Sequence, residues 1–144
     1  MKKVYIKRID KDLPLPKYHT DGSVAFDLLA RETTSIKKGD IALIPGNVIV
    51  KVPNGYMLTV VPRSSTPRKK GLLIPHGIGV IDQDYHGPED EVLIQVLNFT
   101  DAEVIVEKGE RIAQAVLVRI DKFEFEEVDD DIIKISRGGL GSTG

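Results

Sequence analysis

Residues 48–61 read VIVKVPNGYMLTVV and place two β-rich runs on either side of a Pro-Asn-Gly turn. Valine, isoleucine, tyrosine and threonine favour strands over helices. Asn-Gly between two such runs is the strongest short-range signal of a β-hairpin. We therefore expect strands at residues 48–52 and 56–61, joined by a tight turn at residues 53–55.

The rest of the chain has the same character, because its apolar runs are short and separated by Gly, Pro, Asn or Asp. No run keeps the 3.6-residue apolar spacing of a helix for three turns, and only residues 66–71 could form a short helical turn. Many short strands with regular turn signals predict an all-β sandwich or barrel. Further strands are expected at residues 4–6, 26–29, 41–44, 92–97, 104–106, 112–120 and 123–126, the last alternating Phe with Glu.

Length and composition exclude several classes of protein. The 144 residues suit one domain, and the absence of cysteine excludes disulfides, thiol nucleophiles and cysteine-ligated zinc. The 20 basic and 22 acidic side chains give a net charge of −2, which argues against a broad basic face for nucleic acid. The chain also lacks a membrane-length apolar run and an N-terminal leader, so we expect a cytoplasmic protein with no membrane partner.

Two polar segments could bind an anion or activate water. Residues 62–65 (PRSS) follow a strand, and an Arg with two hydroxyls there could cradle an anion or only form a capped turn. Residues 79–87 (GVIDQDYHG) carry Asp82 and Asp84, which in extended chain would point to the same side, one of them as a general base. Tyr85 could stack on a flat ligand or a sugar, or the segment could be a polar turn.

Two further features have both a structural and a functional interpretation. Gln114 lies two residues after Ile112 in an apolar strand, so a core-facing Ile112 would leave Gln114 in need of a polar partner. The Gly-rich tail, residues 136–144, could be a frayed end or an arm that closes over phosphate oxygens. The three histidines are scattered, which gives no spacing typical of metal ligands.

Together and in this order, the segments resemble the five motifs of the homotrimeric deoxyuridine triphosphatase (dUTPase) family. The resemblance implies a jelly-roll-like β-barrel of the β-clip type, residues 1–135, and a phosphate-closing arm of the same domain, residues 136–144. It also implies a homotrimer with three sites at subunit interfaces. The five segments are AFDL (25–28), PRSS (62–65), GVIDQDYHG (79–87), GERIAQ (109–114) and RGGLGSTG (137–144).

The implied reaction is the hydrolysis of dUTP to dUMP and pyrophosphate, which limits uracil incorporation into DNA and supplies dUMP for thymidylate synthesis. By this resemblance, Asp82 would be the general base that deprotonates a water for attack on the α-phosphorus. Tyr85 would lie against the deoxyribose and leave no room for a ribose 2′-hydroxyl. Backbone groups from His76 through Gly79 to Ile81 would recognise the edge of uracil.

The resemblance also implies how the phosphates and the cofactor, Mg²⁺, are bound. The triphosphate would hold the ion, with no direct protein ligand, although Asp27 could reach it through water. Otherwise Asp27 would pair with Arg111 behind the bound substrate. The remaining substrate-binding residues would be Arg63, Ser64, Ser65 and Gln114 at the phosphates, Arg137, Ser142 and Thr143 at the γ-phosphate, and Leu140 and Gly141 in the closing arm.

Three positions depart from the family's usual pattern, and two other functions remain open. Ser65 stands where Gly is usual, His76 where Asn is frequent, and Leu140 where an aromatic residue stacks on the base. A dCTP deaminase shares the fold and fits Arg-Ser-Ser with Arg68, but its chemistry needs a carboxylate where this chain has Gln95. A non-catalytic nucleotide-binding regulator on the same fold would need no general base.

Overall fold

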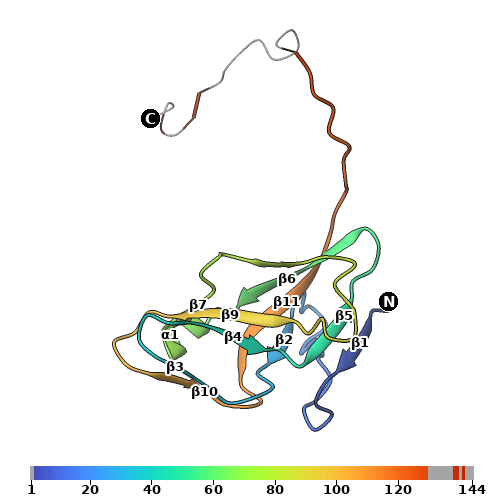
Figure 1. The fold of residues 1–144 in the computed structure, drawn as a ribbon. Helices are drawn as coiled ribbons and strands as arrows, with labels where there is room; N and C mark the ends of the chain where they lie inside the picture. The colour runs from blue at the N-terminus through green and yellow to red at the C-terminus, as the bar shows by residue number, and fades with distance from the viewer. Residues whose placement is uncertain (1, 130–137, 140, 142–144) are drawn as a thin grey trace.

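The computed structural model describes residues 2–129, 138, 139 and 141 of the chain. Figure 1 shows that the strands and the short helix pack together in one body, and that the chain runs away from this body after the last strand. The helix is α1 (Thr66–Lys70). The strands are β1 (Tyr5–Arg8), β2 (Phe26–Leu29), β3 (Thr34–Ile36), β4 (Ile41–Pro45), β5 (Val48–Lys51), β6 (Tyr56–Pro62), β7 (Leu72–Leu73), β8 (Gly79–Ile81), β9 (Leu93–Asn98), β10 (Val104–Val106) and β11 (Arg111–Arg119).

In the described part of the chain, the strands pair in two larger sheets and two ribbons, all antiparallel. The larger sheets have the orders β2-β11-β6-β8 and β4-β9-β7, and the ribbons are β1-β5 and β10-β3. Leu28 and Leu58 of the first sheet and Ile44 and Ile94 of the second are fully buried in one core. The all-β class expected from the sequence is confirmed. No helix among the described residues is long and apolar enough to cross a membrane.

The Pro-Asn-Gly segment forms a turn, but the expected hairpin is wrong. β5 pairs with β1, whereas β6 pairs with β11 and β8. The Tyr56 N–H donates to the Pro53 carbonyl at 3.1 Å, and Gly55 has φ of +76° while Asn54 is not left-handed. One left-handed residue at the third position describes a type II turn, whose twist splays the strands that it joins. The turn therefore carries the chain from one sheet to another.

Helix α1 confirms the helical turn expected near residues 66–71. Pro67 lies in its first turn, where a missing N–H costs no hydrogen bond. Gly71 ends the helix with φ of +66° and donates its N–H to the Pro67 carbonyl at 2.9 Å. The buried Thr66 hydroxyl donates to the Ile112 carbonyl at 2.8 Å, which fixes the helix to β11.

β11 does not alternate simply, because its pairing with β2 shifts register between Arg111 and Ala113. Such a bulge adds one residue to a strand, so the inward and outward positions exchange beyond it. Ile112 and Ala113 are both buried, and Gln114 is only half-buried. Ile112 and Gln114 therefore do not share one face, and that prediction is wrong. Gln114 still finds a polar partner, since its Nε2 donates to the Pro62 carbonyl at 3.3 Å.

The strand expected at residues 123–126 is also wrong. Residues 120–129 form no strand and run outward from the body (Figure 1), with Phe123 79% and Phe125 98% exposed. Alternation of Phe with Glu is typical of a half-buried strand, but no neighbouring strand covers this segment in the described chain. The sequence reading also missed β3, β7 and β8, which are only two or three residues long.

Replacing Gly71 with Ala should destabilise the fold by about 3 kcal/mol. The left-handed backbone would be strained, and the added Cβ would collide with the Thr100 Cγ2. Urea unfolding of the wild type and the variant measures the loss. Gly55→Ala is the matched control, because it has φ of +76° but open space around its Cβ, and it should lose about 1 kcal/mol. Equal losses in the two variants would contradict the proposed collision.

Candidate functional site

One carboxylate gathers the charged side chains at the ends of three strands. Asp27 lies on β2 opposite Gln114 of β11, and its side chain is 11% exposed. Its Oδ1 forms an ion pair with the Arg63 Nε at 2.9 Å, just after β6, and its Oδ2 accepts from the Arg111 Nη1 at 3.3 Å, at the start of β11. The His19 Nε2 lies 3.2 Å from the same Oδ2. Asp27 thus orients two guanidinium groups that belong to motifs far apart in the sequence.

A pocket of about 470 Å³ opens beside these arginines and is mainly cationic. Lys70 Nζ pairs with the Glu110 carboxylate at 2.8 Å. Four cations against one carboxylate suit a small polyanion, which could bind by charge-assisted hydrogen bonds. The lining residues are Arg63, Ser65, Thr66, Lys69, Lys70, Gly109, Glu110 and Arg111.

Ser65, which stands where the family usually has Gly, occupies ordinary backbone. It precedes α1 with φ of −89° and ψ of −15°, a conformation that any residue adopts, and its hydroxyl makes no capping bond to the helix. Ser64 is exposed beside it. The substitution therefore leaves the loop backbone unstrained and places one more hydroxyl at the rim of the pocket.

Backbone bonds fix the loop that carries motif four. The Gly109 N–H donates to the Ala30 carbonyl at 2.7 Å, and the Ala30 N–H donates to the Glu110 carbonyl at 3.0 Å. The Lys108 N–H donates to the Thr33 hydroxyl at 3.1 Å. These bonds place Gly109 and Arg111 where both line the cationic pocket.

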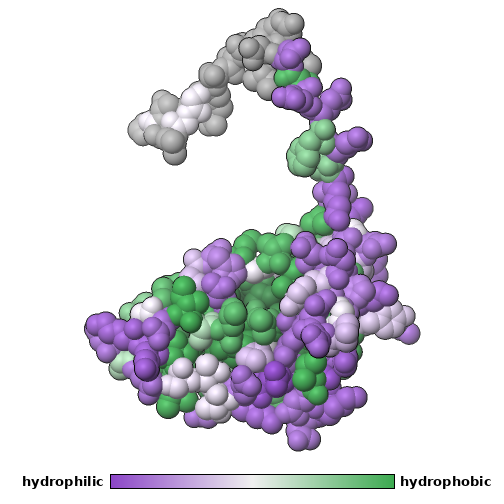
Figure 2. All heavy atoms as spheres, viewed as in Figure 1, coloured by the Kyte–Doolittle hydropathy of each residue, from purple (hydrophilic) through white to green (hydrophobic). Residues whose placement is uncertain are grey.

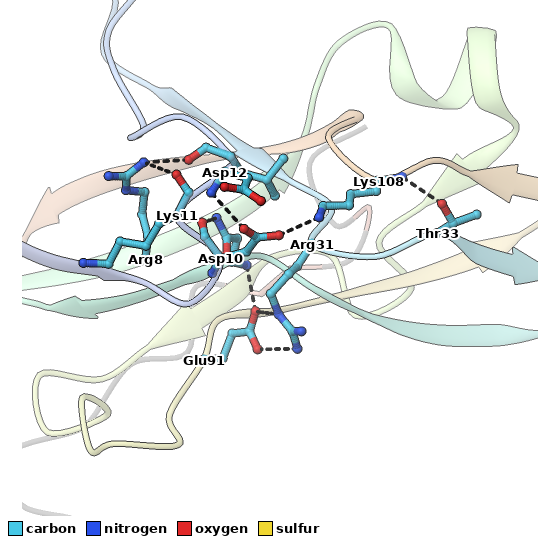
Figure 3. Close-up of polar contacts among 10 residues, drawn as sticks. Arg8, Asp10, Lys11, Asp12, Arg31, Thr33, Glu91 and Lys108 are labelled. Atoms are coloured by element: carbon cyan, nitrogen blue, oxygen red, sulfur yellow. Dashed lines mark hydrogen bonds and ion pairs between the residues drawn. The ribbon is translucent and has the colours of Figure 1, made fainter.

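Ion pairs extend this support to the N-terminal segment (Figure 3). The Lys108 Nζ lies 2.6 Å from the Asp10 Oδ2, and this bond raises the pKa of Lys108. Arg31 makes a bidentate pair with Glu91 at 2.9 and 3.0 Å, and this pair raises the pKa of Arg31. The Asp10 N–H in turn donates to the Asn47 Oδ1 at 2.7 Å.

Motif three occupies a separate place along β6. Gly79 pairs with Val60, and a Cβ on Gly79 would lie 3.2 Å from the Val60 Cβ and 3.7 Å from the His76 Nε2. This close approach accounts for glycine at position 79. His76 is exposed at the turn that precedes β8, so its imidazole is available to a ligand beside this strand.

The residues after β8 form a turn rather than extended chain. The Tyr85 N–H lies 3.4 Å from the Asp82 carbonyl, and the His86 N–H donates to the Asp84 carbonyl at 3.0 Å. The expectation that Asp82 and Asp84 point to one side as in a strand is therefore wrong. Asp82 is exposed, and its carboxylate makes no hydrogen bond or ion pair with the described residues. The Tyr85 hydroxyl donates to the Glu91 carbonyl at 3.1 Å, which fixes the ring beside Asp82.

The strand register separates Asp82 from the cationic pocket. Ile81 pairs with Leu58, so Asp82 lies near Met57 at the start of β6, while Arg63 follows its end. Six residues of extended strand span about 20 Å. One chain therefore brings Arg63, Ser64, Ser65, Gln114, Asp27 and Arg111 together, and places Asp82, Tyr85, His76, Gly79 and Ile81 in a second group.

Some expected site residues lie outside the described residues, and others were missed. Arg137, Leu140, Ser142 and Thr143 are not described, and Gly141 is described only as an exposed residue with φ of +87°. Sequence reasoning missed His19 at Asp27 and Lys69 at the pocket. The basic run at residues 68–70, directly after Arg-Ser-Ser, was the signal for Lys69.

The described residues do not form a protein cage for a metal ion. No group of three or more carboxylates and histidines lies close enough together among residues 2–129, 138, 139 and 141. Both Asp27 oxygens already contact cationic groups or an imidazole. A divalent ion here would therefore take its ligands mainly from the bound anion and water.

A family model for dUTPase matches residues 11–144. This chain belongs to the dUTPase family. It is 41% identical to a deoxyuridine 5′-triphosphate nucleotidohydrolase of Lactococcus lactis, over 98% of this chain and 95% of that protein. It is 38% identical to a protein of the same name from Dictyoglomus turgidum, over 100% of this chain and 99% of that protein.

Solved dUTPase structures share the fold of this family member. The crystal structure of the dUTPase from Streptococcus mutans has a TM-score of 0.76 and 35% identity, covering 83% of this chain and 98% of that chain. A mutant dUTPase of Staphylococcus bacteriophage 80alpha with dUpNHpp has a TM-score of 0.87 and 25% identity, covering 100% and 99%. The match therefore extends over the whole barrel.

Replacing Asp10 with Asn in this dUTPase-family chain should remove a pH-dependent contribution to stability. The bond from Lys108, followed by the Asp12 N–H, holds the pKa of Asp10 below its ordinary value. A lowered carboxyl pKa stabilises the fold above about pH 4, and this contribution is lost as the pH falls through the folded-state pKa. The Tm difference between wild type and variant should be present at neutral pH and should disappear in acid.

Thermal melts at a series of pH values measure this difference. Asp12→Asn is the control, since it leaves the Asp10–Lys108 pair in place and should follow the wild type at every pH. A Tm difference for Asp10→Asn that stayed constant into strong acid would show that the charge of Asp10 is not responsible.

Proposed function

We propose that this chain hydrolyses dUTP to dUMP and pyrophosphate. The observation that carries the proposal is the match, over 98% of the chain, to a relative named deoxyuridine 5′-triphosphate nucleotidohydrolase. The cationic pocket supports it, because a triphosphate is the polyanion that such a pocket suits. A role in limiting uracil in DNA follows from this activity and stays a prediction, as does the cytoplasmic location expected from the sequence.

Asp82 is the proposed general base. Its exposed carboxylate accepts a proton from a water, which attacks the α-phosphorus as the bond to the β-phosphate oxygen breaks and pyrophosphate leaves. Tyr85, whose hydroxyl is fixed by the Glu91 carbonyl, packs against the deoxyribose. Backbone groups from His76 to Ile81 bind uracil, along the strand edge where Gly79 lies close to Val60.

The phosphates are bound by side chains that the fold orients in advance. Arg63 is held by Asp27, as is Arg111, so each reaches the ligand with little loss of side-chain freedom. Ser65 adds a neutral donor in the pocket, and Ser64 beside it and Gln114, bonded to the Pro62 carbonyl next to Arg63, add further ones at the phosphates. The arm, residues 136–144, closes the site through Arg137, Ser142 and Thr143 at the γ-phosphate, with Leu140 and Gly141 near the base.

Mg²⁺ is the proposed cofactor, held by phosphate oxygens and water. When bound with the triphosphate, the ion would supply positive charge that offsets the charge of the phosphates. A mutant dUTPase from phage phi11 of Staphylococcus aureus, 22% identical, has a structural Mg(II) ion by its description. In this chain the guanidinium groups of Arg63 and Arg111 bind the phosphates, and Asp27 orients these two groups.

A homotrimer with sites between subunits would complete the site. The separation of about 20 Å along β6 between Asp82 and Arg63 is large for two groups that act on one phosphate chain, which supports a second chain supplying one of them. The sheet β4-β9-β7 also has an apolar outer face, with Ile41 and Leu43 56% exposed and Leu93 42% exposed. Figure 2 shows apolar surface across the middle of the face where β4 and β9 run. Such a face is typical of a subunit interface.

Release of pyrophosphate from dUTP, dTTP, dCTP and UTP, with Mg²⁺ present, tests the function. We expect turnover of dUTP and at least about 100-fold lower kcat/KM for the other three, since a shaped pocket excludes a methyl, an amino group or a hydroxyl. Removal of Mg²⁺ with EDTA should abolish turnover. Ammonia release from dCTP would favour the deaminase, and dUTP binding with no turnover would favour the regulator.

Asp82→Asn and Arg63→Ala test whether one site is shared between two chains. Each variant alone should lose about 100- to 10,000-fold in kcat. After co-refolding in equal amounts, about one site in four should regain both groups by random assortment, and activity should return. As a control, Asp82→Asn mixed with the double variant cannot restore any site. A mixture of the single variants that stayed inactive would place both groups in one chain.

A further inference from the structure

The cations of the pocket differ in whether a carboxylate already neutralises them. Arg63 and Arg111 share Asp27, at 2.9 and 3.3 Å. Lys70 is paired with Glu110 at 2.8 Å and also donates to the Ile105 carbonyl. Lys69 lines the same pocket and makes no ion pair with any described residue.

We infer that Lys69 is a further substrate-binding residue, whose ammonium group contacts the phosphate chain of the nucleotide. The inference rests on the proposed function for its ligand, and it adds a residue that the five motifs do not include. The two arginines share one carboxylate, and Lys69 is the pocket cation that no carboxylate of the described residues offsets at all, so its full charge is available to an anion. An ammonium group on a flexible stem can follow a phosphate chain as its charge is redistributed to the leaving group.

The fold holds the backbone of Lys69 in place although its helix is short. The Lys69 N–H donates to the Ser65 carbonyl at 2.8 Å, which ties it to the serine of the same pocket. Thr66 fixes the start of the helix to β11, and the left-handed Gly71 fixes its end. Lys69 therefore has a set position relative to Arg63 and Ser65, and only its side chain must be ordered when an anion binds.

The adjacent residue provides a matched control. Arg68 lies on the same helix, is exposed and carries the same charge, but it does not line the pocket. A general effect of net charge on an anionic ligand would change equally when either residue is replaced. A contact specific to the pocket would change only with Lys69. Arg68 is also the arginine that fits a deaminase, so its loss should matter only if that rival function is correct.

Titration calorimetry with inorganic pyrophosphate and Mg²⁺ tests the contact without relying on turnover. Lys69→Ala should weaken the affinity for pyrophosphate about tenfold, as expected for the loss of a charged hydrogen bond, while Arg68→Ala stays within about twofold. Lys69→Arg should keep most of the affinity. Thermal melts should show equal Tm values for all four proteins, because Lys69 makes no internal pair.

Steady-state kinetics with dUTP complete the test. Lys69→Ala should raise KM or lower kcat/KM about tenfold, and the effect should shrink at high salt. Equal effects in Lys69→Ala and Arg68→Ala, or no effect of Lys69→Ala on pyrophosphate binding, would overturn the inference. If the wild-type chain does not hydrolyse dUTP, the proposed function fails, whereas the pyrophosphate titration still decides the role of Lys69.

Discussion

The shared carboxylate of Asp27 is the constraint on which the cationic pocket depends. Two guanidinium groups in one small pocket repel each other, and a carboxylate that is 11% exposed between them offsets that repulsion while fixing their directions. The carboxylate is in place because β2, β11 and β6 are adjacent in one sheet. The order of the strands therefore determines the chemistry of the pocket, and Lys108, Asp10 and the Arg31–Glu91 pair hold the loop beside it.

The same sheet sets a limit on what one chain can do. β6 carries motif two beyond its end and pairs with motif three near its start, so a straight strand keeps the two groups apart. No side-chain rotation closes a separation of this size. This separation supports the proposed site shared between copies. The cationic pocket itself lies within one chain, so a net charge of −2 over 144 residues does not prevent a local cationic site for a polyanion.

Sequence patterns predicted the strands well and their partners poorly. The fold class, α1 and most strands follow from short β-rich runs and turn residues, which are local properties. The sequence alone could not show that the Asn-Gly turn does not form a hairpin. Only Gly55 is left-handed, whereas a type I′ hairpin turn needs two left-handed residues, and this difference changes the twist between the strands. The bulge at Ile112 could not be predicted from the sequence either, and it places Gln114 on the opposite side of β11 from the predicted one. His19 joins the site only through a tertiary contact, whereas Lys69 lies in a basic run directly after Arg-Ser-Ser.

Residues 123–126 are exposed although their sequence pattern predicts a half-buried strand, and this exposure is consistent with the proposed site between subunits. Residues 123–126 alternate Phe with Glu, as a strand does with one face covered, yet Phe125 is almost fully exposed in the single chain. Two exposed phenylalanines cost free energy in water unless something covers them. In the proposed trimer a second copy can cover the two phenylalanines. The alternation of Phe with Glu would then mark one face that is buried against another subunit. The proposed trimer would thus account for a burial pattern that the single chain does not satisfy.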